Sequence, residues 1–179
     1  LRCPRRSHAN VRIDLVPGYS ISRIIKGGWQ LAQGHSARST AAEAHADMAA
    51  FVEAGITTFD CADIYTGVEE QIGSFAEASG RAIEVHTKYV PDLASLATVN
   101  EAEVRAIIDR SSTRLRRKAL DLVQFHWWDY SVDRFVEVAR HLLFHVLAER
   151  PCEPRDVGVQ HHALRRRTRE HVFDARKQR

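Results

Sequence analysis

Short β-branched runs alternate with helical stripes along most of the chain, and this alternation constrains the fold more than any other feature. The β-rich runs begin near residues 21, 56, 83, 120 and 156. Helical stripes fill the intervals over residues 40–54, 68–78, 100–115 and 131–147. Repeated strand-then-helix units predict a parallel sheet with helical crossovers. The 179 residues are enough for one domain with a sizeable core.

Local signals mark the ends of the predicted helices. Thr40 and Glu43 have the spacing of a capping box, and so do Asn100 and Glu103. Gly55 follows the first predicted helix at the position where a glycine most often ends a helix. These signals predict helices that begin just after Thr40 and Asn100.

Two architectures fit this pattern, an open doubly wound sheet and a (β/α)8 barrel. The nine glycines form no GxGxxG motif and no Walker loop, although this absence does not exclude an open sheet. Asp60, Lys88 and His126 end the second, third and fourth predicted strands, and Tyr65 follows Asp60 in the next loop. Catalytic groups of a β/α barrel come from the C-terminal ends of several strands. The polar residues therefore favour an α/β fold of the (β/α)8 TIM-barrel type.

These four side chains form a set with a specific chemistry. A phenol is a poor acid at pH 7, but a nearby ammonium makes loss of its proton easier, and a carboxylate holds that ammonium in place. A neutral imidazole can orient a carbonyl oxygen by hydrogen bonding. Together such groups would protonate a carbonyl oxygen as a hydride arrives at its carbon. Each residue taken alone also fits a structural role, such as a turn Asp or a solvated Lys.

Residues 55–65, Gly-Ile-Thr-Thr-Phe-Asp-Cys-Ala-Asp-Ile-Tyr, resemble the signature of the aldo-keto reductase family. In that family a glycine-led strand ends in Asp, and a Tyr follows five residues later. The similarity continues through Gly67, Glu70 and Gly73. Further matching segments are residues 27–30 (Gly-Gly-Trp-Gln), 86–88 (His-Thr-Lys) and 121–127 (Asp-Leu-Val-Gln-Phe-His-Trp). The resemblance runs from about residue 21 to residue 147.

The resemblance implies a barrel that reduces an aldehyde or ketone to an alcohol by hydride transfer from NADPH. Asp60, Tyr65, Lys88 and His126 would form the catalytic tetrad. Tyr65 would be the general acid, Lys88 would ease loss of its proton, Asp60 would pair with Lys88, and His126 would orient the carbonyl.

The resemblance also implies residues for cofactor and substrate. Gly28, Trp29 and Asp60 would lie near the nicotinamide, and Trp127 would line the substrate pocket. Packing in the core is the alternative for Trp127, because aromatic side chains dominate cores.

The length departs from the family, because a full barrel needs roughly 250 residues. We expect an N-terminal extension over residues 1–15, a partial barrel of four to five βα units over 16–159, and a poorly ordered basic tail over 160–179. The predicted function is therefore an NADPH-dependent oxidoreductase, or alternatively an inactive truncated member that acts as an interaction or cofactor-binding subunit. Open barrel edges predict self-association.

Charge and hydropathy limit the remaining classes of partner and location. Residues 155–179 carry a local charge of +5 against a net charge of +3 for the whole chain, but they hold few aromatic residues, which argues against a nucleic-acid partner. No apolar run is long enough to span a membrane. We expect a cytoplasmic protein, with a plastid or mitochondrial location as the alternative if the basic N-terminus belongs to a transit peptide.

No metal site is predicted, and the cysteine beside Asp60 is expected to pack in the core. His141 and His145 have a spacing that can bind zinc, but two ligands do not fill a tetrahedral site. Cys61 lies next to a carboxylate, which makes its thiol less reactive.

Overall fold

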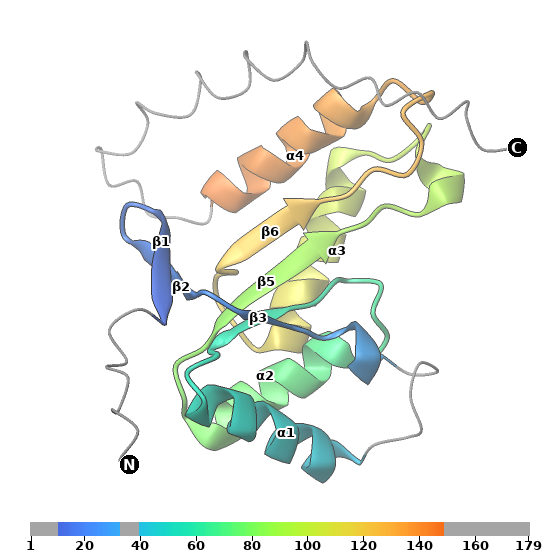
Figure 1. Ribbon diagram of the computed structural model, residues 1–179. Coiled ribbons are helices and arrows are strands. Elements are labelled where there is room, and N and C mark those ends of the chain that lie inside the picture. The colour runs from blue at the N-terminus through green and yellow to red at the C-terminus, as the bar shows by residue number, and fades with distance from the viewer. Residues whose placement is uncertain (1–10, 33–39, 149–179) are drawn as a thin grey trace, which may run out of the picture. The chain divides into compact units, whose positions relative to one another are not determined.

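The computed structural model describes residues 11–32 and 40–148 (Figure 1). In chain order these residues form a β-hairpin followed by four strand–helix units. The fifth strand predicted near residues 156–159 and the tail predicted over 160–179 lie outside the described residues.

Four parallel strands form the central sheet, in the order β3-β4-β5-β6. These strands are β3 (Ile25–Gly27), β4 (Thr58–Asp60), β5 (Glu84–Tyr89) and β6 (Leu122–Phe125). Each strand lies beside the strand that follows it in sequence, which is the arrangement of consecutive units in a β/α barrel. The structure therefore confirms the predicted α/β fold with a parallel sheet.

Within residues 11–32 and 40–148, four α-helices alternate with the strands: α1 (Ala41–Glu53), α2 (Val68–Ser79), α3 (Glu101–Leu115) and α4 (Phe135–Ala148). Two short 3₁₀ helices are η1 (Trp29–Leu31) and η2 (Leu93–Ser95). Both predicted capping boxes are present, at Thr40 and at Asn100. Gly55 ends α1 with a φ of 85°, a conformation that favours glycine. Within the described residues, no helix combines the length and the apolar content that a membrane span requires.

The helix α4 begins later than the sequence predicts. Its first residue is Phe135, whereas the helical stripe predicts a start near residue 131. The carboxylate of Asp129 accepts a hydrogen bond from the backbone N–H of Ser131 at 2.9 Å. An Asp that binds its own backbone two residues on stabilises a turn instead of a helix.

Residues 12–22 form a hairpin that the sequence analysis did not predict. The strands β1 (Arg12–Val16) and β2 (Tyr19–Ser22) pair antiparallel around Gly18, whose φ is 82°. The sequence predicts an N-terminal extension over residues 1–15, and its β-rich run near residue 21, which spans residues 21–26, predicts one strand. That strand is interrupted at residues 23–24, where the chain leaves the hairpin and enters the sheet.

One face of the sheet carries apolar side chains and is covered by the helices. Phe59 and Val85 pack with residues of α1 and α2 in one core cluster. Tyr89, Val123 and Phe125 pack with residues of α3 and α4 in a second cluster. Because side chains alternate along a strand, this apolar set occupies one face only.

The opposite set of alternate residues is polar apart from Ile25, Gly27 and Leu122, and we call the face that it occupies the open face. The register pairs Asp60 with His86, and Lys88 with Gln124, so these four side chains share the open face. Asp60, Lys88 and Gln124 lie toward the carboxyl ends of their strands. The strands therefore present charged and amide groups where a barrel would place its site.

The hairpin binds the open face at the amino end of the strands. Arg12 Nη2 lies 2.5 Å from Glu84 Oε1, and Arg12 Nη1 donates to Thr57 Oγ1 at 2.7 Å. The hydroxyl of Tyr19 lies 2.9 Å from His86 Nε2. These contacts hold the hairpin to the sheet by polar interactions.

Candidate active site

An ion pair joins the ends of β4 and β5 on the open face. Lys88 Nζ lies 2.6 Å from each carboxylate oxygen of Asp60 and donates to the carbonyl oxygen of Cys61 at 2.9 Å. Gln124 Nε2 donates to Asp60 Oδ1 at 3.2 Å. The Lys88 and Asp60 side chains remain 20% and 28% exposed, so small molecules can reach the pair.

Tyr65 lies beside this ion pair. The ring centroid of Tyr65 is 5.6 Å from Lys88 Nζ. The backbone N–H of Tyr65 donates to Ala62 O at 3.0 Å, and the N–H of Val68 donates to Tyr65 O at 3.1 Å. A tight turn immediately before α2 therefore places the phenol next to the ammonium. The structure thus brings together three members of the predicted tetrad.

His126, the fourth member of the predicted tetrad, directly follows β6 and contacts a different neighbour. Its imidazole meets the ring of Trp128 edge-on, with centroids 4.6 Å apart. Across the described residues, no hydrogen bond connects this imidazole to Asp60, Tyr65 or Lys88. His126 thus shares the edge of the sheet with the other three but is not joined to them.

Gly28 and Trp29, the predicted cofactor-facing residues, lie against the same edge. The N–H of Gly28 donates to Asp60 O at 2.7 Å. A Cβ at Gly28 would lie 2.8 Å from both Asp60 O and Val68 Cγ1, so the close approach of this turn requires glycine. Trp29 begins η1 and is 49% exposed.

Trp127, predicted to line the substrate pocket, lies in the second core cluster and is 5% exposed. Its indole N–H donates to Asp129 O at 2.9 Å, and its ring packs against Phe125 with centroids 5.7 Å apart. These contacts support the packing alternative. Its neighbour Trp128 is 49% exposed.

A buried carboxylate lies behind the ion pair, and the sequence analysis missed it. Glu69 is fully buried, and its Oε1 accepts from Thr87 Oγ1 at 2.7 Å. Arg114 Nη1 lies 3.4 Å from Glu69 Oε2. Because Thr87 directly precedes Lys88, Glu69 supports the end of β5 from the helix side.

The family resemblance in the sequence points to Glu70 instead of Glu69. Glu70 is 49% exposed and pairs with Arg114 at 3.0 Å. Glu69 lies three residues before Ile72 and four before Gly73, both buried, which places all three on the buried side of α2. The spacing of Glu69 from Ile72 and Gly73 was the signal in the sequence that could have identified it as the buried carboxylate.

Burial determines the pKa of the Cys61 thiol, which directly follows Asp60 in the sequence. Cys61 is fully buried, and burial raises the pKa of its thiol to about 12. This confirms the prediction that it is a packing residue.

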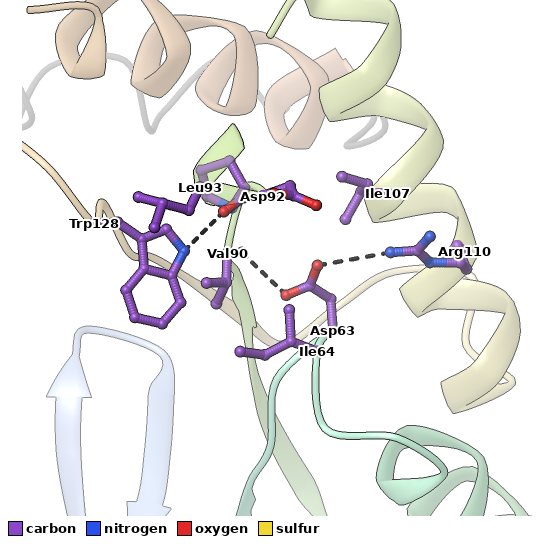
Figure 2. A pocket seen from close by; sticks show the side chains of 9 residues that line it. Asp63, Ile64, Val90, Asp92, Leu93, Ile107, Arg110 and Trp128 are labelled. Carbon is purple, nitrogen blue, oxygen red and sulfur yellow. Dashed lines mark hydrogen bonds and ion pairs between the residues drawn. The ribbon is translucent and has the colours of Figure 1, made fainter. Parts of the chain in front are cut away.

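A cavity of about 510 Å³ lies next to the site but contains none of the four tetrad residues (Figure 2). Loops that follow β4 and β5 form its walls, together with α3 and one exposed indole. The lining residues are Asp63, Ile64, Val90, Pro91, Asp92, Leu93, Ile107, Arg110 and Trp128.

No metal centre is present in the described part of the chain, where no group of three or more His, Cys, Asp or Glu side chains is placed to hold an ion. His141 lies near two carboxylates, Glu101 at 3.9 Å and Glu137 at 3.6 Å. The side chain of His145 lies outside the described residues.

Comparison with known proteins supports the resemblance. A family model described as "Aldo/keto reductase family" matches residues 23–174. A Pseudomonas aeruginosa protein assigned to the aldo-keto reductases superposes with a TM-score of 0.64 at 21% identity, covering 78% of this chain and 57% of its own. Aldo/keto reductases from Brucella melitensis and Bacillus halodurans, the latter in its holo form, each superpose with a TM-score of 0.55. They show 25% and 21% identity, cover 74% and 72% of this chain, and are themselves covered over 48% and 44%.

The chain therefore spans about half the length of the structures that it matches. The shared part is the α/β fold with four parallel strands and four helices, equivalent to about half of a barrel. A comparison with curated proteins gave no match.

Proposed function

The chain belongs to the aldo/keto reductase family, and from this premise we propose that its site reduces an aldehyde or ketone to an alcohol with NADPH. The observation that supports this function is the Lys88–Asp60 pair at 2.6 Å with the Tyr65 ring 5.6 Å from Lys88 Nζ. A phenol beside a fixed ammonium is suited to giving a proton to a developing alkoxide.

Each residue of the site has a separate part in the proposed reaction. The phenol of Tyr65 donates its proton to the carbonyl oxygen as the carbonyl carbon is reduced. The ammonium of Lys88 stabilises the phenolate that remains. Asp60 holds Lys88 in place by accepting from its ammonium at 2.6 Å, and Gln124 donates in turn to Asp60 at 3.2 Å. His126, at the same edge of the sheet, orients the carbonyl oxygen.

The residues present fit the nicotinamide end of NADPH, which supplies a hydride to the carbonyl carbon when bound. Gly28, Trp29 and Asp60 would hold it. The N–H of Gly28 donates to Asp60 O at 2.7 Å, and this hydrogen bond keeps the start of η1 close to Asp60. Trp29, the next residue in the chain, is half-exposed. The role of Trp127 as part of the substrate wall rests on the resemblance alone.

A non-catalytic role as an interaction or cofactor-binding subunit is the second candidate. The observation that favours it is the sheet itself, because among the described residues β3 and β6 each pair with a single strand. Unpaired strand edges bind further strands. We expect the 179-residue chain to self-associate in light scattering and to show little or no reductase activity alone.

Cofactor binding and turnover test the proposal separately. NADPH is titrated by fluorescence, and its oxidation with a simple aldehyde is followed for two proteins. One is the chain alone, and the other is residues 1–148 joined to the later barrel strands of the Pseudomonas aeruginosa relative. Turnover by the joined protein that is lost in Lys88→Met supports the reductase. NADPH binding without turnover would favour the non-catalytic role, and turnover unchanged in Lys88→Met would refute the assignment of the site.

A further inference from the structure

We propose that Asp63 is a positioning residue: it holds the loop over residues 61–67, and with it Tyr65, against the end of β5 that carries Lys88. This inference rests on the proposed function. None of the motifs that point to the tetrad includes a role for Asp63.

The first support is that Asp63 binds the chain on both sides of Tyr89, the last residue of β5 and the neighbour of Lys88. The backbone N–H of Asp63 donates to Lys88 O at 3.1 Å. Its side-chain Oδ1 accepts from the backbone N–H of Val90 at 3.0 Å. Two hydrogen bonds from a single residue therefore fix the loop to the strand two residues before Tyr65.

The second support is the burial of the carboxylate and its contacts with α3. The Asp63 side chain is 2% exposed, and Arg110 Nη2 lies 3.7 Å from its Oδ2. Arg114 Nη1 donates to the backbone carbonyl of Asp63 at 3.0 Å. Figure 2 shows the carboxylate between Val90 and Arg110, at the wall of the cavity. These contacts with α3, added to the two hydrogen bonds with the end of β5, restrict the loop far more than an exposed turn residue would.

The third support is that Asp63 can change charge near neutral pH. Its pKa is raised to about 6, chiefly by burial and to a smaller extent by Glu69, while the hydrogen bond from the Val90 N–H and the charge of Arg110 oppose the rise. The charged or titratable groups that face it are Arg110 and Arg114 from α3, Glu69 from α2 and Tyr89 from β5. A charged carboxylate makes the stronger hydrogen bond. The loop should thus be held more firmly at pH 8 than at pH 5.

Three variants separate positioning from general stability. Asp63→Ala removes both the acceptor and the charge, whereas Asp63→Asn keeps an acceptor for the Val90 N–H and removes only the charge. Asp92→Asn is the matched control, because Asp92 lines the same cavity and its side chain accepts, within the described residues, a hydrogen bond from the N–H of Ala94 alone, at 2.8 Å. Circular dichroism and thermal unfolding check that each variant of the 179-residue chain folds.

The first readout is structural and needs no catalysis. Nuclear Overhauser contacts between the Tyr65 ring and the Lys88 ε-methylene are measured by NMR at pH 5 and pH 8. We expect these contacts to weaken severalfold in Asp63→Ala, to persist in Asp92→Asn, and to lose their pH dependence in Asp63→Asn. Unchanged contacts in a folded Asp63→Ala overturn the proposal. If that variant does not fold, unchanged pH dependence in Asp63→Asn overturns it.

The second readout is kinetic, in the joined protein that tests the reductase. Misplacing a proton donor lowers turnover and leaves cofactor binding intact, so kcat should fall about tenfold in Asp63→Ala with an unchanged KM for NADPH. A wild-type kcat in that variant overturns the proposal. Weakened NMR contacts in a protein without any turnover would instead refute the proposed function and leave the positioning role supported.

Discussion

The two faces of the β3–β6 sheet are built from alternate residues of the same strands, yet they differ in almost every property. On the helix side, Phe59 and Val85 are at most 1% exposed and contact other apolar groups. On the open face, Asp60 binds both Lys88 and Gln124, and all three side chains remain accessible. Burial of apolar area dominates folding free energy, so the helix side should account for most of the stability.

This difference shows how a sheet can hold reactive groups at low cost to the fold. A partly exposed ion pair contributes little to stability, typically below about 1 kcal/mol. The open-face pair is therefore replaceable as far as folding is concerned and is available for chemistry. The predictions below test this division, from the largest expected effect to the smallest.

The largest effect should come from the phenol on the open face. We expect Tyr65→Phe to lower turnover by about 10²-fold or more in the joined protein, because it removes the proposed proton donor. NADPH affinity should stay nearly the same, and so should the free energy of unfolding. Steady-state kinetics measure the turnover, and a fluorescence titration measures the NADPH affinity. Tyr130→Phe is the control, because Tyr130 is 69% exposed and packs edge-on against Phe135; turnover of wild-type size in Tyr65→Phe would break the assignment.

On the helix side, one added methyl group should destabilise the whole fold. Gly73 lies in α2, and a Cβ there would come within 2.4 Å of Arg114 O and 2.8 Å of the carbonyl carbon of Leu115. The obstructing atoms are backbone, so α2 and α3 must separate. We expect Gly73→Ala to lower the free energy of unfolding by about 2–4 kcal/mol, although Ala is the better helix former.

Urea denaturation measures this loss, and a second α2 variant provides the comparison. Ala78 is exposed on the same helix, and Ala78→Gly should cost only about 1 kcal/mol. A Gly73→Ala protein as stable as the wild type would mean that the two helices do not pack as closely as the structure shows.

The helix side was also the part that the sequence predicted best. Thr40 and Asn100 fix the starts of α1 and α3 through hydrogen bonds within four residues of sequence, so a local pattern is sufficient. The attachment of the hairpin to the sheet could not be predicted in this way, although its turn at Pro17-Gly18 is a local signal. Its attachment depends on the contact of Arg12 with Glu84, which are 72 residues apart.

The residues of the site also divide into those that a sequence pattern predicts and those that only the structure reveals. Asp60 and Lys88 were predicted from their positions at strand ends, where parallel topology brings side chains together. Asp63, Glu69 and Gln124 were missed, because their importance lies in which atoms they contact across elements. Trp127 and Trp128 are adjacent, and only the packing of Phe125 shows which of them is buried.

A third prediction compares the two ion pairs of the open face. Arg12 binds Glu84, Thr57 and the backbone of Ser20, and thereby attaches the hairpin to the sheet. We expect Arg12→Met to lower the free energy of unfolding by about 1–2 kcal/mol, because a half-buried carboxylate loses its partner. Lys88→Met should cost less than about 1 kcal/mol, since that pair joins no additional element.

The pH dependence of stability provides a further check on the Arg12 pair. Burial tends to raise the pKa of Glu84, but hydrogen bonds from Arg12, Thr57 and Thr58 outweigh it, and the net shift is downward. A lowered carboxyl pKa adds stability above the unfolded value of about 4.3, which is lost as the pH falls through the folded value. Urea denaturation between pH 3 and pH 6 should show this loss in the wild type and a smaller one in Arg12→Met; equal slopes would contradict the role of Arg12.

The smallest effect should come from a hydroxyl buried on the helix side. Tyr89 is fully buried in the second core cluster, and its hydroxyl has no hydrogen-bond partner among the described residues. Burial raises its pKa to about 12, so the group stays neutral at physiological pH. Leaving a buried hydroxyl unpaired costs free energy, whereas the stacking of its ring on Phe125, with centroids 5.9 Å apart, is retained by phenylalanine. We therefore expect Tyr89→Phe to leave the free energy of unfolding unchanged or to raise it by up to about 1 kcal/mol.

Tyr19→Phe is the matched control, because the Tyr19 hydroxyl lies 2.9 Å from His86 Nε2 and its removal should cost about 1 kcal/mol. If Tyr89→Phe proves the more destabilising of the two, the helix side holds a polar partner for that hydroxyl, and the contrast between an apolar and a polar face would have to be redrawn.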